Sequence, residues 1–380
     1  MHDFRKHMET VALLLVVGVV AGSSVAAAQT WSKPVFVATG AAEGLSTNGK
    51  GTSALIFGQT ASGLFASVQT GGVWGTPVEI TTQGQHGSIA VAPNGDVLAV
   101  WSFHLNNSSA PVEVQAAFFS GGRWGNPITL STTANGGAAL GFDGHSQATL
   151  IWEQPTSPTT CGLVEVTGNS EGGFGAPQAI ASGCYGWIRL AVNTAGQAIA
   201  IQGAPTLEVA PVIATSRDTN GTWGAPVTVA NRTYGYEWPN VGLGNNGTVV
   251  VIWKTRVQSA VAVRENGVWS GPMTPPNVAG GGGTAAVDGG GNAVIAYGGK
   301  LSYRPAGGSF QTPVVLSGSV GGVVADDTGT FAVGGTSVAV RLAGTSTWNQ
   351  NGPNGGVVIA PGLAVAVTGP DIDIATAAVP

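Results

Sequence analysis

The sequence predicts an all-β fold made of repeated four-stranded units, and three observations support this prediction. A ten-residue phrase recurs along the chain at a nearly regular interval. Pairs of short apolar runs lie between its copies and are separated by Asn, Asp and Gly. The composition also suits short strands and tight turns, because the 380 residues include 61 glycines and only 9% are charged, against roughly a quarter in an average globular protein.

The recurring phrase is an aromatic residue followed three positions later by proline, as in GGVWGTPVEI from Gly71 and NGTWGAPVTV at 220–229. The aromatic positions are Trp31, Trp74, Trp124, Phe174, Trp223, Trp269 and Phe310, with a degraded copy at Trp348. Their intervals are 43, 50, 50, 49, 46, 41 and 38 residues, close to the roughly 40–45-residue period of four-stranded propeller blades. We therefore expect a β-propeller of seven blades, with eight as the alternative.

The first two strands of each unit are expected to form a hairpin. The segments 88–101, 188–202 and 240–253 each contain two apolar runs around a turn rich in Asn, Asp and Gly, which is the composition that hairpin turns require. The first run is rich in Gly, Ala and Val, as expected of strands crowded around a central axis. A third strand is expected after most hairpins, for example at 112–119 and 260–265.

The recurring phrase is expected to form the fourth, outermost strand. Trp223, Val227 and Val229 share one parity, so one face of this strand should pack against a neighbouring blade. The proline lacks an N–H group, which an edge strand facing water tolerates and which hinders pairing with a foreign strand. Because the chain begins with such a strand, we expect it to lie beside the last blade and close the ring.

The first 28 residues are expected to be a secretory signal peptide. Arg5 and Lys6 precede an apolar run of about a dozen residues, and small residues lead to a cleavage site after Ala28. The remaining chain, 29–380, is expected to be a single propeller domain that is released to the periplasm or the exterior.

The composition also bears on partners and cofactors. Cys161 and Cys184 are the only cysteines, and in a secreted chain a single disulfide is the expected outcome. The net charge of −5 argues against nucleic acid as a partner. No further apolar run of spanning length, phosphate-binding loop or metal-ligand motif is present. We expect no membrane insertion, no cofactor and no metal, and we expect a monomer.

The phrase W-G-x-P-V-x-I followed by V-A-x-N-G-x-x-x-x-V-W resembles the repeats of bacterial secreted β-propeller proteins, a group that includes sialidase-like and lectin-like propellers. The resemblance covers nearly all of residues 29–380 and implies the architecture rather than an activity. Asp boxes of the form Ser-x-Asp-x-Gly-x-x-Trp are not intact, and the arginines expected of a sialidase site are missing. The catalytic residues of sialidases are therefore not carried over.

The resemblance also implies a binding face, formed by the loops from second to third strand and from fourth strand to the next blade. Aromatic residues gather in two of these loops, and exposed aromatic rings stack on sugars or anchor protein partners. The predicted ligand-binding residues are Tyr185, Trp187, Arg232, Tyr234, Tyr236, Trp238 and His104. The expected Cys161–Cys184 bond would stiffen the same face.

Three functions remain open from the sequence. The first is non-catalytic binding of a carbohydrate or a surface protein through the aromatic-rich loops. The second is a glycoside hydrolase or lyase acting on a polysaccharide, with Glu153 and Glu237 as candidate acid and base. These carboxylates could equally be solvated loop residues. The third is a structural or assembly module that uses the sides of the blades.

Overall fold

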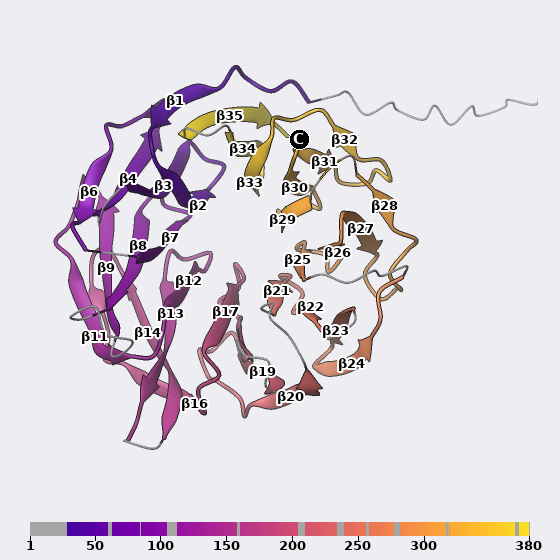
Figure 1. The fold of residues 1–380 in the computed structure, drawn as a ribbon, viewed down its shortest axis with the longest axis horizontal. Coiled ribbons are helices and arrows are strands. Elements are labelled where there is room, and N and C mark those ends of the chain that lie inside the picture. The colour runs from indigo at the N-terminus through magenta and orange to yellow at the C-terminus, as the bar shows by residue number, and fades with distance from the viewer. Residues whose placement is uncertain are drawn as a thin grey trace, which may run out of the picture.

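The computed structural model is a ring of antiparallel sheets around a central axis (Figure 1). Within its described residues all regular structure is β-strand, and none of it is a helix that could span a membrane. The expected signal peptide lies outside these residues. The structure describes residues 29–59, 63–83, 85–104, 112–157, 160–203, 210–233, 239–255, 258–276, 282–316, 318, 320–368 and 372–379.

The strands fall into consecutive units, which we number from the first complete one. Unit 1 contains β2 (Ala41–Thr47), β3 (Thr52–Gln59), β4 (Gly63–Thr70), β5 (Val73–Trp74) and β6 (Val78–Thr81). Unit 2 contains β7 (Gln85–Val91), β8 (Val97–His104), β9 (Val112–Ser120), β10 (Arg123–Trp124) and β11 (Ile128–Ala134). Unit 3 contains β12 (Ala138–Phe142), β13 (Ala148–Pro155), β14 (Cys161–Asn169), β15 (Gly173–Phe174) and β16 (Gln178–Ser182).

The remaining units have four strands each. Unit 4 contains β17 (Trp187–Val192), β18 (Ala198–Gly203), β19 (Ala210–Arg217) and β20 (Val227–Thr233). Unit 5 contains β21 (Asn240–Leu243), β22 (Val249–Lys254), β23 (Ser259–Glu265) and β24 (Val268–Met273). Unit 6 contains β25 (Gly283–Val287), β26 (Ala293–Tyr297), β27 (Lys300–Arg304) and β28 (Val314–Val315). Unit 7 contains β29 (Val320–Ala325), β30 (Phe331–Gly335), β31 (Ala339–Arg341) and β32 (Asn349–Gln350). Unit 8 contains β33 (Gly355–Ala360), β34 (Leu363–Thr368), β35 (Ile372–Ala378) and β1 (Val35–Ala38).

Hydrogen bonding joins units 7 and 8 into one eight-stranded sheet, and each other unit is a sheet of its own. A single residue pair, Gly335 with Gly355, makes this join. The described strands thus form eight units of four or five strands within seven sheets, and the preferred expectation of seven blades is not confirmed. None of these sheets closes on itself, but the innermost strands contact one another in sequence from β2 to β33, and β33 contacts β2.

The two ends of the described chain lie side by side in unit 8 (Figure 1). Strand β1 pairs antiparallel with β35, with Val35 opposite Ile374 and Ala38 opposite Ile372. The backbone N of Ser32 also donates to the carbonyl oxygen of Thr376 at 2.8 Å. The first strand therefore completes the unit that the last three strands begin.

The core is divided among the interfaces between units. Within the described residues, eight apolar clusters each combine side chains of two consecutive units, including units 8 and 1. Each recurring phrase contributes its aromatic ring to a different cluster, from Trp31 in the cluster of units 7 and 8 to Trp348 in that of units 6 and 7. The prediction that these rings pack between neighbouring blades is confirmed.

The outermost strand of units 1 to 3 is broken in two, and the phrase explains why. The glycine after the aromatic residue donates its N–H to a carbonyl of the third strand, as from Gly75 to Val68 at 2.9 Å and from Gly125 to Phe118 at 2.8 Å. The proline two residues later has no N–H to continue the ladder. Pairing resumes beyond it in β6, β11 and β16.

Candidate functional site

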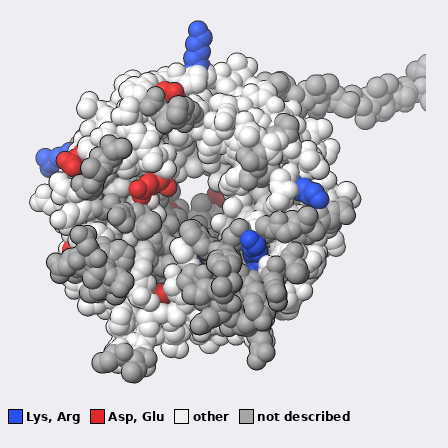
Figure 2. Space-filling view, viewed as in Figure 1, with Lys and Arg blue, Asp and Glu red and all other residues white. Residues whose placement is uncertain are grey.

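A pocket of about 970 Å³ lies where the innermost strands β2, β7, β12 and β17 begin. It occupies the end of the central channel at which the second strands end and the third strands start, since Ser102 of β8 and Val112 of β9 also line it. Figure 2 shows the hollow at the centre of the ring and the scarcity of charged side chains on the viewed face. The polar and aromatic residues that line the pocket include Glu43, Ser88, Ser102, Asn135, Trp187 and Arg189.

Glycines in the innermost strands let units 1 and 2 approach each other beside the pocket. A Cβ atom on Gly87 would lie 2.6 Å from Cδ1 of Ile56 in unit 1, and one on Gly44 would lie 3.3 Å from Cγ2 of Ile89 in unit 2. The carboxylate of Glu43 accepts a hydrogen bond from the backbone N of Gly87. An acidic side chain from unit 1 is thereby held against unit 2 at the rim of the pocket.

Arg189 supplies the positive charge of the described lining. Its guanidinium Nη1 donates to the carbonyl oxygen of Ile188 at 3.0 Å, and burial lowers the pKa of Arg189 below its usual value. A partly desolvated guanidinium interacts more strongly with a polar or anionic group than one in bulk water does. The residues that line the pocket thus include one carboxylate, one guanidinium, two hydroxyls, one amide and one indole.

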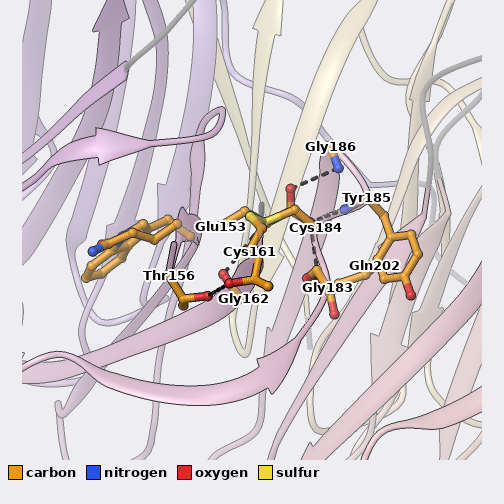
Figure 3. The surroundings of a disulfide bond; sticks show 12 residues. Glu153, Thr156, Cys161, Gly162, Gly183, Cys184, Tyr185, Gly186 and Gln202 are labelled. Carbon is orange, nitrogen blue, oxygen red and sulfur yellow. Dashed lines mark hydrogen bonds between the residues drawn. A yellow bond between two sulfur atoms is a disulfide. The ribbon is translucent and has the colours of Figure 1, made fainter. Parts of the chain in front are cut away.

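The segment 182–187 leads from unit 3 into β17 and passes beside the disulfide (Figure 3). Its last two residues, Gly186 and Trp187, line the pocket. The predicted disulfide between Cys161 and Cys184 is confirmed, with Cα atoms 5.3 Å apart. The backbone N of Gly183 also donates to the carbonyl oxygen of Cys161 at 2.7 Å. These two links fix the segment to the start of β14.

Glu153 lies beneath this segment and is 1% exposed, so the expectation that it could be a solvated loop carboxylate is wrong. Its Oε1 accepts from the backbone N of Tyr185 at 2.7 Å, and its Oε2 accepts from that of Gly186 at 2.8 Å. Nε2 of Gln202 adds a third bond to Oε1 at 3.1 Å. A carboxylate engaged in this way is suited to holding the backbone and poorly placed to exchange protons with a substrate.

The structure describes only some of the other predicted site residues. Trp187 lines the pocket, while the half-buried Tyr185 turns its ring toward Gly183. Arg232 lies in β20 and His104 in β8, and their side chains fall outside the described part of the structure. The positions Tyr234, Tyr236, Glu237 and Trp238 lie wholly outside the described residues.

Sequence reasoning overlooked Glu43, Asn135 and Arg189. The sequence did contain an indication of Glu43 and Arg189. Both are charged residues in innermost strands that are otherwise rich in small and apolar residues. Arg189 also shares the parity of Trp187. In the described part of the chain no three His, Cys, Asp or Glu side chains gather as a metal-ligand set. The lining combines polar and aromatic side chains, a composition that ligand pockets commonly have.

No family model and no curated protein matches the chain. Among solved structures, the fold resembles the Dos1 propeller, with a TM-score of 0.57, 9% identity, and coverage of 92% of this chain and 95% of that one. It also resembles an ulvan lyase of polysaccharide lyase family PL25, solved bound to -[GlcA(1-4)Rha3S]-, with a TM-score of 0.52, 11% identity, and coverage of 91% and 96%. At these identities the likeness concerns the fold alone, and the chain is a β-propeller protein.

Proposed function

We propose that this protein is a secreted β-propeller that binds a carbohydrate in the pocket at the mouth of its central channel. The observation that carries the proposal is the pocket itself, whose lining combines Trp187 with Ser88, Ser102 and Asn135. Sugars offer apolar C–H faces to aromatic rings and hydroxyl groups to amide, hydroxyl and charged side chains. The disulfide is compatible with secretion.

The architecture we propose for this role is an eight-bladed ring fastened by β1. Four of its units, 1 to 4, contribute the described pocket lining. The pocket thus lies where several blades meet, and concave sites at the junction of structural units commonly bind ligands. The ulvan lyase that was solved bound to -[GlcA(1-4)Rha3S]- has a similar fold, and this likeness supports the proposal of a carbohydrate ligand. The lyase activity is a property of that enzyme.

Binding to a glycan array tests the proposal, followed by calorimetry on the strongest oligosaccharide. Trp187→Ala should weaken binding by about tenfold to a hundredfold, because stacking and burial on one ring contribute roughly 1.5–3 kcal/mol. Phe36→Ala is the matched control, since Phe36 is 60% exposed in the outermost strand β1. An equal loss of glycan affinity in both variants, or full affinity in Trp187→Ala, would contradict the proposal that the glycan binds in this pocket.

A second measurement on the same oligosaccharide separates binding from catalysis and from protein recognition. Mass spectrometry of the bound oligosaccharide after prolonged incubation should show an intact chain. Shortened or unsaturated products would instead favour the hydrolase or lyase hypothesis. A chain that binds no glycan but captures an extracellular protein through Trp187 would favour the alternative of a surface-protein ligand.

A further inference from the structure

Glu153 differs from the residues at the same place in neighbouring units. It is the sixth residue of β13, counted from the hairpin turn, and the sixth residues of β8, β18 and β22 are Ser102, Gly203 and Lys254. A fully buried carboxylate is costly unless donors surround it. Donors specific to this part of the ring must therefore surround Glu153.

The donors come from the wall of the pocket. Tyr185 and Gly186 give their backbone N–H groups to the two carboxylate oxygens, and Gly186 and the following Trp187 line the pocket. Each oxygen of Glu153 thus holds one residue of the segment that delivers Trp187. If the segment lifted, the buried charge would lose both contacts at once.

Gln202 completes the arrangement from unit 4. It is the fifth residue of β18, a place held by Trp101, Trp152 and Trp253 in β8, β13 and β22. Its Nε2 donates to Oε1 of Glu153 and to the carbonyl oxygen of Gly183, at 3.1 and 3.0 Å. Replacing the usual tryptophan with glutamine gives Glu153 and the segment 182–187 a shared donor.

The backbone of Glu153 holds the opposite wall. Its carbonyl oxygen accepts a hydrogen bond from the backbone N of Asn135 at 2.8 Å, and Asn135 and Gly136 line the pocket. The two walls meet closely, since a Cβ atom on Gly136 would lie 3.9 Å from the carbonyl oxygen of Gly186. One buried residue is therefore bonded to both walls.

We infer that Glu153 is a positioning residue of the ligand pocket, which sets the segment carrying Trp187 against the segment carrying Asn135. This inference rests on the proposed function, because it concerns the same pocket. If the wall is already fixed before the ligand binds, no conformational entropy is lost in ordering it on binding, and the affinity is higher for that reason. The disulfide restrains the segment at Cys184, and Glu153 restrains it at the two residues beside Trp187.

The test is Glu153→Gln, which keeps the shape but turns an NH₂ group toward one of the backbone N–H donors. Hydrogen exchange of a peptide covering 183–187 should rise, and affinity for the oligosaccharide identified on the array should fall about tenfold. The matched control is Glu171→Gln, the same change at an exposed turn of unit 3, which should alter neither quantity. Gln202→Leu is a milder second variant if Glu153→Gln fails to fold, and should give smaller changes of the same sign.

A spectroscopic readout separates positioning from loss of overall stability. In protein labelled with 5-fluorotryptophan, the ¹⁹F resonance of Trp187, assigned by its absence in Trp187→Phe, should shift or broaden in Glu153→Gln. The resonances of Trp269 and Trp348 should stay in place. Unchanged exchange at 183–187, or increased exchange with full affinity, overturns the inference. Failure of the proposed function would look different: Trp187→Ala would bind as well as the unaltered protein, while exchange would still report on Glu153.

Discussion

The two faces of the ring are held together in different ways. At the hairpin turns between first and second strands, one turn bonds to the next: Nδ2 of Asn193 donates to Gly244 O at 3.0 Å, and Nδ2 of Asn246 donates to Gly290 O at 3.0 Å. At the channel mouth, the described contacts around the pocket do not recur from unit to unit, notably the disulfide and the hydrogen bonds of Glu153. Repeated contacts build the frame, whereas contacts that occur at one place in the ring shape the site.

The largest effect is expected from replacing Arg217, which lies beside the hairpin turns. Its guanidinium pairs with the buried carboxylate of Glu165 and donates to Gly196 O at 3.1 Å. Arg217→Ala should lower the free energy of unfolding by about 3–5 kcal/mol, because a buried charge is left without its partner. Urea denaturation measures the loss, and glycan affinity should be unchanged at low temperature.

Glu165→Leu/Arg217→Met is the control for this first prediction. It removes both charges together and should recover most of the lost stability. A double variant as unstable as Arg217→Ala would mean that packing, and not the unpaired carboxylate, causes the loss. Loss of affinity in a folded Arg217→Ala would contradict the separation of frame and site.

Removing the disulfide tests the role of contacts at the other face of the ring, at the channel mouth. Cys161→Ala/Cys184→Ala opens a link between residues separated by 23 positions, for which chain entropy predicts a loss of about 3 kcal/mol. Because the link restrains the pocket wall, we also expect weaker glycan binding, unlike with Arg217→Ala. Denaturation and calorimetry check the two effects, and reduced protein of unaltered sequence should behave likewise. A fall in stability with full affinity would assign the disulfide to the frame.

The smallest expected effect concerns Tyr297, at the mouth end of β26. Its hydroxyl donates to Pro276 O at 2.8 Å, and burial raises the pKa of Tyr297 to about 12. The neutral phenol is favoured in the folded state, so this stabilisation is complete below the ordinary pKa near 10 and is lost as pH rises toward 12. Tyr297→Phe should cost about 1 kcal/mol at neutral pH and flatten the loss of stability between about pH 10 and 12.

Urea midpoints measured from neutral to alkaline pH check this prediction. Tyr303→Phe on the neighbouring strand β27 serves as the control. It removes a phenol hydroxyl but leaves the hydrogen bond from Tyr297 to Pro276 in place. An alkaline slope in Tyr297→Phe equal to that of the unaltered protein would show that another group governs the alkaline loss.

The repeat was enough to predict the strands, the turns and the packing of the aromatic rings, because these follow from local patterns that recur. The number of units was harder to predict. The last phrase is degraded around Trp348, and its strand β32 spans only Asn349–Gln350. The eighth unit also takes its outermost strand from the other end of the sequence. Counting copies of the phrase cannot show how such distant pieces combine.

The pocket could be predicted only in part. Trp187 was found because aromatic residues in loops are conspicuous. The role of Glu153 depends on N–H groups at 185 and 186 and on Gln202 in another unit, and nothing in the neighbouring sequence indicates these contacts. Arg189 of β17 and Asn135, which precedes β12, converge on the pocket because β12 and β17 are adjacent in the ring, a proximity that follows from the assembled fold.

The pairing of β1 with β35 also sets an order of events during synthesis. The ribosome makes Val35 long before Ile374, its partner across the ladder. Until the final strand emerges, β1 is an unsatisfied edge that can pair with the wrong strand or with another chain. Units 1 to 6 can form as they are completed, whereas unit 8 must wait for the whole chain. The strand made first is therefore among the last to reach its native place.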